Sequence, residues 1–495
     1  MYNTHNYIRT NVKTRHIIKR TFKCIAIGLM LSATRLSAQT PIVLHAFTAA
    51  SGLTNADGFN STAHLILSGN LLYGTTQFGG TNGYGTVFSM HTDGTCYKVL
   101  YAFTGGADGA VPHQNLVVSG NMIYGTVNGG TNPITGGSVF SMTTNGDNFN
   151  TLYTFPTNAI TSANGSLGNP NGGLTLCDGT LYGTAYQGGI SNAGSIFSVT
   201  TNGNFTLLRL FEPGTDGANP LGVLVLSDGT LYGTARNGGS NGIWGTVYSI
   251  STNGENFTVL HTFSGGTNDA HEPQGGVILC GNMLYGTTIY GGTYGHGTVF
   301  AISTNGSSYS ILHSFNPATG EGVDARTGIV MAGNTVYGIT LLYKGSNLSG
   351  SIYSVNTDGS SFTTLYGFSP PSGGVIGGTN ASGSAPDGTL VMSGNVLYGT
   401  APYGGVYGNG TIFSLPVIPF ISSLKVTGTN VTHNAIDGIE GETCTLLASP
   451  NLTLPLSQWT PLATNILTSG GNFTFTNAAN PASSPQFYTL QTTLP

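Results

Sequence analysis

The chain has 495 residues, of which 77 are glycine and only 6% are Asp, Glu, Lys or Arg. An average globular protein has about 25% of these charged residues. Long helices need many Ala, Glu, Lys, Leu and Arg residues, so the composition excludes helical solenoids and coiled coils. The chain still has 39% hydrophobic residues, enough for a core, and we predict an all-β protein with many tight turns.

Residues 1–38 have the pattern of a secretory signal peptide. Six basic residues precede the apolar run 25–31, which is too short for a membrane span of about 20 residues. Small residues at 36–38 then offer a cleavage site before Gln39. An uncleaved anchor is the alternative, although Arg35 follows the apolar run closely. We therefore predict a secreted or cell-surface protein with no membrane span after cleavage.

Cleavage changes the charge of the chain. Seven of the 13 basic residues precede Gln39 and all 18 acidic residues follow it, which leaves a net charge of about −12. Nucleic-acid binding depends on Lys and Arg neutralising phosphates, so we predict no nucleic-acid partner. We expect the mature protein to act as a monomer.

A unit of about 54 residues recurs seven times, a period typical of a four-stranded propeller blade. Its marker is the triplet Tyr-Gly-Thr after an apolar residue, with Ile339 replacing Thr in the sixth copy. The tyrosines of the seven copies are Tyr73, Tyr124, Tyr182, Tyr232, Tyr285, Tyr337 and Tyr398.

Each copy contains four apolar segments joined by turn signals. In the fourth copy, strands are predicted at 222–227, 230–235, 245–250 and 257–263. Asp-Gly, Gly-Asn or Asn-Gly pairs separate strand one from two and strand three from four, as in two-residue hairpins. The aromatic residues inside these strands are predicted to form the core.

The strand count indicates how the repeat array ends. Strand three occurs seven times but the turn after it only six times, while residues 43–47 at the mature N-terminus match strand four. We predict that this N-terminal strand completes the last blade and closes a seven-bladed β-propeller over residues 41–415. An open β-solenoid is the alternative, but it does not explain the extra strand.

The repeat units resemble the GloVer tandem repeat of secreted bacterial choice-of-anchor proteins. In the fifth copy the shared residues are Leu284–Thr287, Gly291–Gly292, Gly297–Ala301, Thr304–Gly306 and Leu312–Phe315. The resemblance implies export and a variable C-terminal attachment module. It implies no established activity and no catalytic residues.

Residues 420–495 follow the repeats and are predicted to form a small β-sandwich-like module for attachment, sorting or an accessory role. Four β-like segments support this prediction: 422–426, 443–447, 472–476 and 486–490. We expect Trp459 in the core of this module, and a sugar platform is the alternative.

Long, variable loops between strands two and three, and from strand four to the next blade, should share one face of the disc. Function usually lies on loops held by a rigid scaffold, so this long-loop face is the candidate binding surface. Aromatic side chains among neutral hydrogen-bonding groups suit glycans, although packing within the loops is an alternative for each of them. The candidate ligand-binding residues are Tyr84, Tyr186, Arg236, Trp244, His271, Tyr290, His296 and Tyr403.

Four aspartates occur 16 residues before the Tyr of their copies. The simpler interpretation is that each closes a turn through the backbone. A ring of carboxylates that holds Ca²⁺ is a weaker hypothesis, and we predict no other cofactor or metal. The four residues are Asp57, Asp108, Asp216 and Asp269.

Four cysteines remain after cleavage: Cys96, Cys177, Cys280 and Cys444. Cys177 and Cys280 occupy the same repeat position two units apart, which argues against a disulfide between them. We predict buried thiols in apolar surroundings.

The sequence favours a secreted, non-enzymatic repeat scaffold that binds an extracellular glycan or protein through the long-loop face. The alternative is a glycan-active hydrolase or lyase with catalytic residues near the propeller axis. His271-Glu272 and the pair Asp324 and Arg326 break the repeat with charge and keep this alternative open. No catalytic triad, metal-ligand spacing or identifiable carboxylate pair supports it.

Overall fold

A computed structural model describes residues 40–62, 64–129, 136–156, 167–343, 349–417, 420–427, 430–436, 443–449, 458–466, 473–478 and 487–493. The predicted signal peptide lies outside them. The chain divides into two compact units. The large unit comprises Pro41–Met331 and Thr335–Pro416, and the small unit includes the described residues from Val417 onward.

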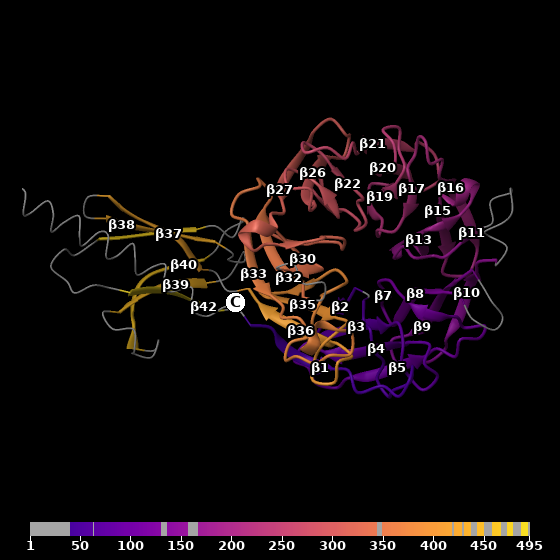
Figure 1. Cartoon of the computed structure of the whole chain (residues 1–495), viewed down its shortest axis with the longest axis horizontal. Helices are drawn as coiled ribbons and strands as arrows, with labels where there is room; N and C mark the ends of the chain where they lie inside the picture. Colours follow the sequence, from indigo (N-terminus) through magenta and orange to yellow (C-terminus); the bar gives the residue numbers. More distant parts are fainter. Residues whose placement is uncertain are drawn as a thin grey trace, which may run out of the picture. The chain divides into compact units, whose positions relative to one another are not determined.

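The large unit is a seven-bladed β-propeller. Figure 1 shows its blades following one another around a ring in chain order, from indigo to orange. Each blade contains a four-stranded antiparallel ladder whose strand one lies nearest the centre and strand four at the outer rim. Every blade therefore repeats the meander that the turn signals predict.

The bounds of the blade strands follow. Strand one is β2 (Ile66–Ser68), β7 (Val117–Ser119), β12 (Thr175–Cys177), β18 (Val225–Ser227), β23 (Ile278–Cys280), β29 (Val330–Ala332) and β34 (Val391–Ser393). Strand two is β3 (Leu71–Thr76), β8 (Met122–Asn128), β13 (Thr180–Ala185), β19 (Thr230–Asn237), β24 (Met283–Thr288), β30 (Thr335–Thr340) and β35 (Val396–Ala401). Strand three is β4 (Thr86–His91), β9 (Ser138–Thr143), β15 (Ser195–Thr200), β20 (Thr246–Ser251), β26 (Thr298–Ser303), β32 (Ser351–Asn356) and β36 (Thr411–Pro416). Strand four is β5 (Lys98–Ala102), β10 (Asn150–Thr154), β16 (Phe205–Leu210), β21 (Thr258–Thr262), β27 (Tyr309–Ser314), β33 (Thr363–Gly367) and, in the seventh blade, β1 (Ile42–Ala46).

β1, the first described strand of the chain, pairs antiparallel with β36. Val43 lies opposite Phe413, and Ala46 lies opposite Thr411. Phe47, which follows β1, is fully buried in one cluster with Phe88 of the first blade and residues of the seventh. The two ends of the repeat array therefore share a core.

The glycine of each Tyr-Gly-Thr triplet is covered by the aromatic residue of strand three. Gly183 pairs with Phe197 in the β13–β15 ladder. A Cβ at Gly183 would lie only 2.7 Å from Cζ of Phe197 and 2.9 Å from a methyl group of Leu174. Seven buried aromatic residues occupy the Phe197 position, as the sequence predicts: Phe88, Phe140, Phe197, Tyr248, Phe300, Tyr353 and Phe413.

A second, shorter set of strands lies among the long loops. It comprises β6 (Ala110–Pro112) on β8, β17 (Ala218–Pro220) on β19, and the pairs β11 (Leu167–Gly168) with β14 (Gln187–Gly188), β22 (Ala270–His271) with β25 (Tyr290–Gly291), and β28 (Gly322–Val323) with β31 (Leu342–Tyr343). Short 3-10 turns are η2 (Ile190–Asn192), η3 (Pro317–Thr319) and η4 (Ser372–Gly374). In the described part of the chain there is no α-helix.

The small unit contains two three-stranded sheets. Their orders are β37 (Phe420–Thr427), β38 (Asn430–Ile436) and β41 (Phe473–Ala478), and β40 (Thr460–Ile466), β39 (Thr443–Ser449) and β42 (Phe487–Thr493). The sequence analysis missed β38 and β40. Most of β40 is exposed, so its apolar residues give no clear alternation. Trp459 is only 8% exposed, and the sandwich arrangement stays a prediction.

The prediction of buried cysteines is wrong for three of the four. Cys96 and Cys280 are exposed and Cys177 is half-buried, whereas Cys444 is buried. Cys177 and Cys280 are the last residues of β12 and β23, where the chain turns in solvent. Cys96 follows the turn between β4 and β5. The apolar character of the thiol did not predict burial here, because the ends of the hairpins lie outside the packed part of a blade.

Candidate functional site

On the long-loop face, one backbone position has the same conformation in all seven blades. It lies 13 residues before the repeat tyrosine and adopts the left-handed conformation, with φ between 49° and 66°. In the fifth blade, Glu272 N donates to the carbonyl of Trp244 in the preceding blade at 2.9 Å, and Ile289 N donates to the Glu272 carbonyl at 3.2 Å. This position therefore links neighbouring blades. Its residues are Asn60, Val111, Asn169, Asn219, Glu272, Asp324 and Ala385.

Two members of this set carry charge, and each is paired. Arg236 donates through Nε and Nη2 to one carboxylate oxygen of Glu272, at 3.1 and 2.8 Å. Arg326 donates to both carboxylate oxygens of Asp324, at 2.9 Å through Nε and by a shorter contact through Nη2. Both pairs are partly buried. The charges that break the repeat therefore form two local ion pairs.

Aromatic side chains lie beside the first ion pair. The imidazole of His271 is 4.7 Å from the Trp244 ring and 5.3 Å from the Tyr290 ring, between centroids. Burial lowers the pKa of His271, although the charges of Glu272 and Asp269 oppose this effect. Its buried Nδ1 has no hydrogen-bond partner among the described residues. His271 therefore joins the loops of the fourth and fifth blades as a neutral ring at pH 7.

A further carboxyl group, Asp387, lies beside the second ion pair. Burial raises the pKa of Asp387 to about 6, while the positive charge of Arg326 opposes this shift. Burial, and then the charge of Asp387, raises the pKa of Tyr403. A carboxyl group that titrates near pH 6 can donate or accept a proton under mild conditions.

These groups lie on the loops of the fourth to the seventh blade, and we call them together the inner arc. It brings together five predicted site residues, namely Arg236, Trp244, His271, Tyr290 and Tyr403. Its other members are Glu272, Asp324, Arg326 and Asp387. The sequence analysis missed Asp387. The one feature that could have indicated it is its position directly after the loop proline Pro386.

The other three predicted residues lie apart from one another. Tyr84 packs its ring on Gly105, where a Cβ would come within 2.6 Å of the ring. Tyr186 lies in the third blade, and its carbonyl accepts a hydrogen bond from the Asn219 side chain at 3.0 Å. His296 is exposed, and its carbonyl accepts from the backbone of Asp324 at 3.5 Å.

Trp244 also packs within its own loops. A Cβ at Gly265 would lie 2.8 Å from the Trp244 ring, so this ring covers the glycine of the next loop. Trp244 is partly buried against the core cluster that contains Phe263. For Trp244, as for Tyr84, the geometry fits the loop-packing alternative. Tyr290 is different, because 44% of its surface is exposed.

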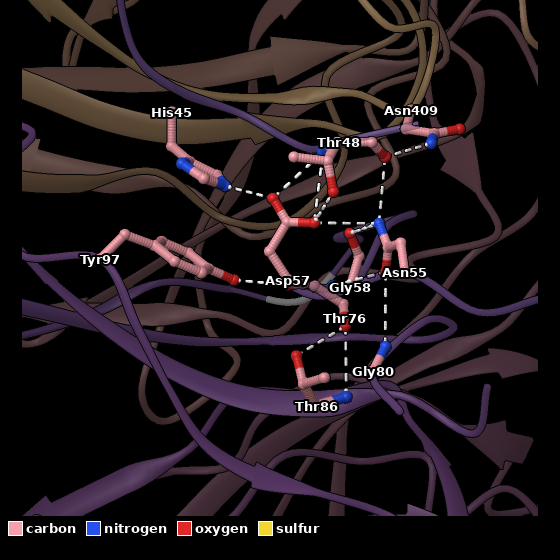
Figure 2. Close-up of polar contacts among 10 residues, drawn as sticks. All are labelled: His45, Thr48, Asn55, Asp57, Gly58, Thr76, Gly80, Thr86, Tyr97 and Asn409. Carbon is pink, nitrogen blue, oxygen red and sulfur yellow. Dashed lines mark hydrogen bonds and ion pairs between the residues drawn. The ribbon is translucent and has the colours of Figure 1, made fainter. Parts of the chain in front are cut away.

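The four aspartates lie in a separate network, which Figure 2 shows for the first blade. The Asp57 carboxylate accepts from His45 Nε2 at 2.9 Å, from the backbone of Thr48 at 3.1 Å and from Asn55 at 3.0 Å. Burial alone raises the pKa of Asp57, but the hydrogen bonds from His45 and Thr48 outweigh it and lower the pKa. Tyr97 of the first blade donates to the Asp57 carbonyl at 2.6 Å.

The same contacts recur in other blades. A carboxylate accepts from a side chain of strand four and from the backbone just beyond it. The strand-four partners are Tyr101 for Asp108, Arg209 for Asp216, His261 for Asp269 and His313 for Glu321. Glu321 has the same repeat offset as the aspartates, and the sequence analysis missed it because the residue type differs.

Each carboxylate of this network is bonded within its own turn, which agrees with the turn-closing interpretation. In the part of the chain that the structure describes, no three His, Cys, Asp or Glu side chains gather to hold a metal ion. None of the described elements is a helix long and apolar enough to cross a membrane.

The fold and its seven equivalent loops define a β-propeller repeat protein. The profile of the Gloeobacter/Verrucomicrobia repeat matches residues 34–243 and 221–443, and the chain belongs to this family. No curated protein matches the chain.

Several solved structures match the chain at low identity and low TM-score. Tricorn protease is 13% identical with a TM-score of 0.38, over 77% of this chain and 34% of its own. PorZ, a surface component of the Porphyromonas gingivalis type-IX secretion system, is 12% identical with a TM-score of 0.46, over 90% and 60%. Oligogalacturonate lyase in complex with manganese is 10% identical with a TM-score of 0.42, over 76% and 96%. The chain thus spans about a third of tricorn protease and three fifths of PorZ, and these similarities assign no activity.

Proposed function

We propose that this protein is an exported, non-enzymatic repeat scaffold that binds a neutral extracellular glycan through the long-loop face of its propeller. The signal-like residues 1–38 and the family resemblance support export to the cell surface or beyond. The C-terminal unit attaches or positions the propeller. The β1–β36 pairing closes the ring, and the protein acts as a monomer.

The distribution of exposed apolar side chains is the observation that carries this proposal. Two of the exposed large hydrophobic residues described on the propeller, Ile42 and Leu207, lie on outer strands. The others lie in the long loops: Leu53, Ile243, Tyr290, Tyr294, Val375, Ile376, Val406 and Tyr407. These loops all lie on the same side of the disc, and function usually lies on loops that a rigid scaffold holds in place.

The polar groups of the same loops favour a neutral ligand. The loops are rich in Asn, Ser, Thr and Gly, and the two arginines of the inner arc are already paired with Glu272 and Asp324. Sugars present apolar C–H faces to aromatic rings and hydroxyl groups to neutral hydrogen-bonding side chains. The chemistry of the face therefore suits a glycan better than a polyanion or a strongly charged protein.

Asp387 supports a second candidate function, a glycan-active hydrolase or lyase. A carboxyl group with a pKa of about 6 beside Arg326 has the protonation behaviour of a general acid or base. Replacement of Asp387 by Asn would abolish any cleavage that depends on this group.

Native gels that contain neutral polysaccharides test both candidates with residues 39–495. We expect retarded migration in at least one gel and no newly released reducing ends. A Tyr290→Ala variant should lose part of the retardation, whereas Leu207→Ala, an exposed residue of an outer strand, should not. Lack of retardation in every gel would contradict glycan binding. Release of new ends that stops with Asp387→Asn would favour the enzyme.

A further inference from the structure

A groove runs along the outer edge of the fifth blade, at the rim of the long-loop face. It consists of two adjoining hollows of about 410 and 540 Å³ that share Thr267, Asn268 and Tyr309. Its walls come from the loop after β21, from the loop that contains Tyr294, and from β27. Both hollows are shallow and open to solvent, so they would contact one side of a chain of sugar units rather than enclose it.

The groove is lined by neutral hydrogen-bonding groups and one exposed aromatic ring. Half of the Tyr294 surface (51%) is exposed to solvent at the edge of the second hollow. The amide of Asn268 is common to both hollows. The residues with hydroxyl groups along the walls are Thr267, Thr293, Ser310, Ser264 and Ser314. The Ser264 hydroxyl already donates to Asp269 at 2.9 Å, and the Ser314 hydroxyl accepts from the Thr293 backbone at 3.2 Å.

The carboxylate and the imidazoles that line the groove already have partners. Asp269 accepts hydrogen bonds from His261 at 3.1 Å and from the backbone of Ser264 at 2.8 Å. His313 is bonded to Glu321 at 2.8 Å. No Lys or Arg occurs among the described residues that line the hollows. The groove therefore presents no cationic side chain of Lys or Arg to an anionic ligand.

The floor of the groove is held in place by stacking. The His261 imidazole lies on the Tyr309 ring with centroids 4.0 Å apart and planes 10° apart. The two residues come from adjacent blades, so neither hollow depends on a single loop for its shape. A floor that is already formed lowers the entropy cost of binding.

An extended peptide that pairs with the outer edge of β27 is the alternative ligand. The edge is interrupted, however, because the β26–β27 register shifts between Ile311 and His313, which leaves Leu312 unpaired. The Leu312 carbonyl also faces the next blade, where a Cβ at Gly359 would lie 2.8 Å from it. A bulge of this kind disfavours the addition of another strand.

We infer that this groove is a binding site for a neutral oligosaccharide chain. Tyr294 stacks on the apolar face of one sugar ring, and Asn268 and the wall hydroxyls bond to its hydroxyl groups. The inference rests on the proposed function, since it places the glycan at the rim of the same face. The inner arc shares no lining residue with the groove, so binding to the arc would not require the groove.

Tyr407 provides a matched control for Tyr294. Both residues lie nine positions after the repeat tyrosine, and Tyr407 is 53% exposed. Tyr407 does not line either hollow. Since both side chains are exposed, neither alanine substitution should disturb folding, and unchanged melting curves would verify this.

The test is affinity electrophoresis of residues 39–495 and of the Tyr294→Ala, Asn268→Ala and Tyr407→Ala variants. The gels contain hydroxyethyl cellulose, xyloglucan or galactomannan, with polygalacturonate as the charged comparison. For the neutral polymer that retards the parent chain, Tyr294→Ala should raise the apparent Kd about tenfold, and Asn268→Ala should raise it as well. Tyr407→Ala should leave it unchanged.

The possible failures are distinguishable. Retardation that survives Tyr294→Ala and Asn268→Ala would overturn the groove and leave glycan binding by the face intact. Retardation by polygalacturonate alone would overturn the neutral class. No retardation by any polymer would contradict the groove and the proposed function together. An immobilised library of random hexapeptides provides a further comparison. If the library captures the parent chain but not Tyr294→Ala, and no polymer retards the parent chain, the groove binds a peptide and the glycan assignment is wrong.

Discussion

The imidazole of His313 lies parallel to the ring of Phe362 in the next blade, with the centroids 3.6 Å apart and the planes 4° apart. The same contact joins other neighbouring blades, and in one of them the Arg209 guanidinium lies 4.4 Å from the Phe257 ring centre. The strand-four residue varies between His, Tyr and Arg. Some of these strand-four residues also bond a carboxylate, as His313 bonds Glu321. Such a residue must combine a flat group, which stacks on the ring of the next blade, with a hydrogen-bond donor. The remaining stacked pairs are His45–Tyr97, Tyr101–Phe149, Tyr153–Phe205 and His261–Tyr309.

The carboxylate in this arrangement makes stability depend on pH. Burial tends to raise the pKa of Asp269, but bonds from His261, Ala270 and Ser264 and the charge of His261 lower it to about 2, from 3.8. A carboxylate with a lowered pKa stabilises the fold when the pH is above its pKa in the unfolded chain. This stabilisation is lost as the pH falls from about 4 to about 2. We expect Asp269→Asn to cost about 2 kcal/mol at pH 7 and almost nothing at pH 2.

Urea unfolding of the parent chain and Asp269→Asn between pH 2 and 7 measures this difference. Asp147→Asn, in an exposed turn, is the control and should change the midpoint little. A cost for Asp269→Asn that is constant across the range would contradict the role of the charged carboxylate.

Asp387 should have the opposite effect on stability. Its pKa is raised from 3.8 to about 6, mainly by burial, so the folded chain binds the proton more tightly than the unfolded chain. The free energy of unfolding then falls as the pH rises from about 4 to about 6, and the penalty persists above that range. Asp387→Asn should raise the melting temperature at pH 8 and leave it nearly unchanged at pH 3.5. Equal shifts at both values would show that charge is not the cause.

Val111 is the one β-branched residue in the left-handed position of the long-loop face, with φ of 53°. Branching at Cβ makes this conformation costly, and several equivalent blades use Asn. We expect Val111→Asn to stabilise the protein by about 1 kcal/mol. Val111→Thr keeps the branch and should bring no gain. Thermal unfolding of the three chains compares them, and a loss of stability in Val111→Asn would show that burial of the valine outweighs the strain.

The contact between Gly183 and Phe197 predicts a coupled pair of substitutions. Gly183→Ala places a methyl group against the ring and should cost about 1–3 kcal/mol. In a Phe197→Leu background the same substitution should cost less, because the end of the ring is absent. A double-mutant cycle from urea unfolding measures the coupling. Strictly additive costs would mean that Gly183 is required for another reason.

Removal of β1 tests the closure of the ring. A chain that begins at residue 48 leaves the outer edge of β36 unpaired and loses the buried Phe47, whose side chain alone is worth about 3–5 kcal/mol. We expect a large drop in melting temperature and association through the open edge. Added synthetic peptide 40–48 should restore both properties. An unchanged monomer with an unchanged melting temperature would contradict closure.

Sequence reasoning predicted most of the propeller because the repeat presents the same evidence seven times. The Tyr-Gly-Thr triplet, the two-residue turns and the buried aromatic residues are local signals, and the blade is a local structure whose strands follow one another in the chain. The small unit contains no repeat, so β38 and β40, in which apolar and polar residues do not alternate clearly, were missed.

The sequence by itself therefore determined the blade, the number of blades, the aromatic core and the face on which the long loops lie. Tertiary structure alone decided which loop residues meet, because these contacts join residues about 20 to 50 positions apart. It brought Arg236 to Glu272 and stacked His261 on Tyr309, while it covered Gly265 with Trp244. A groove is formed by the space between such residues, and no single blade contains it.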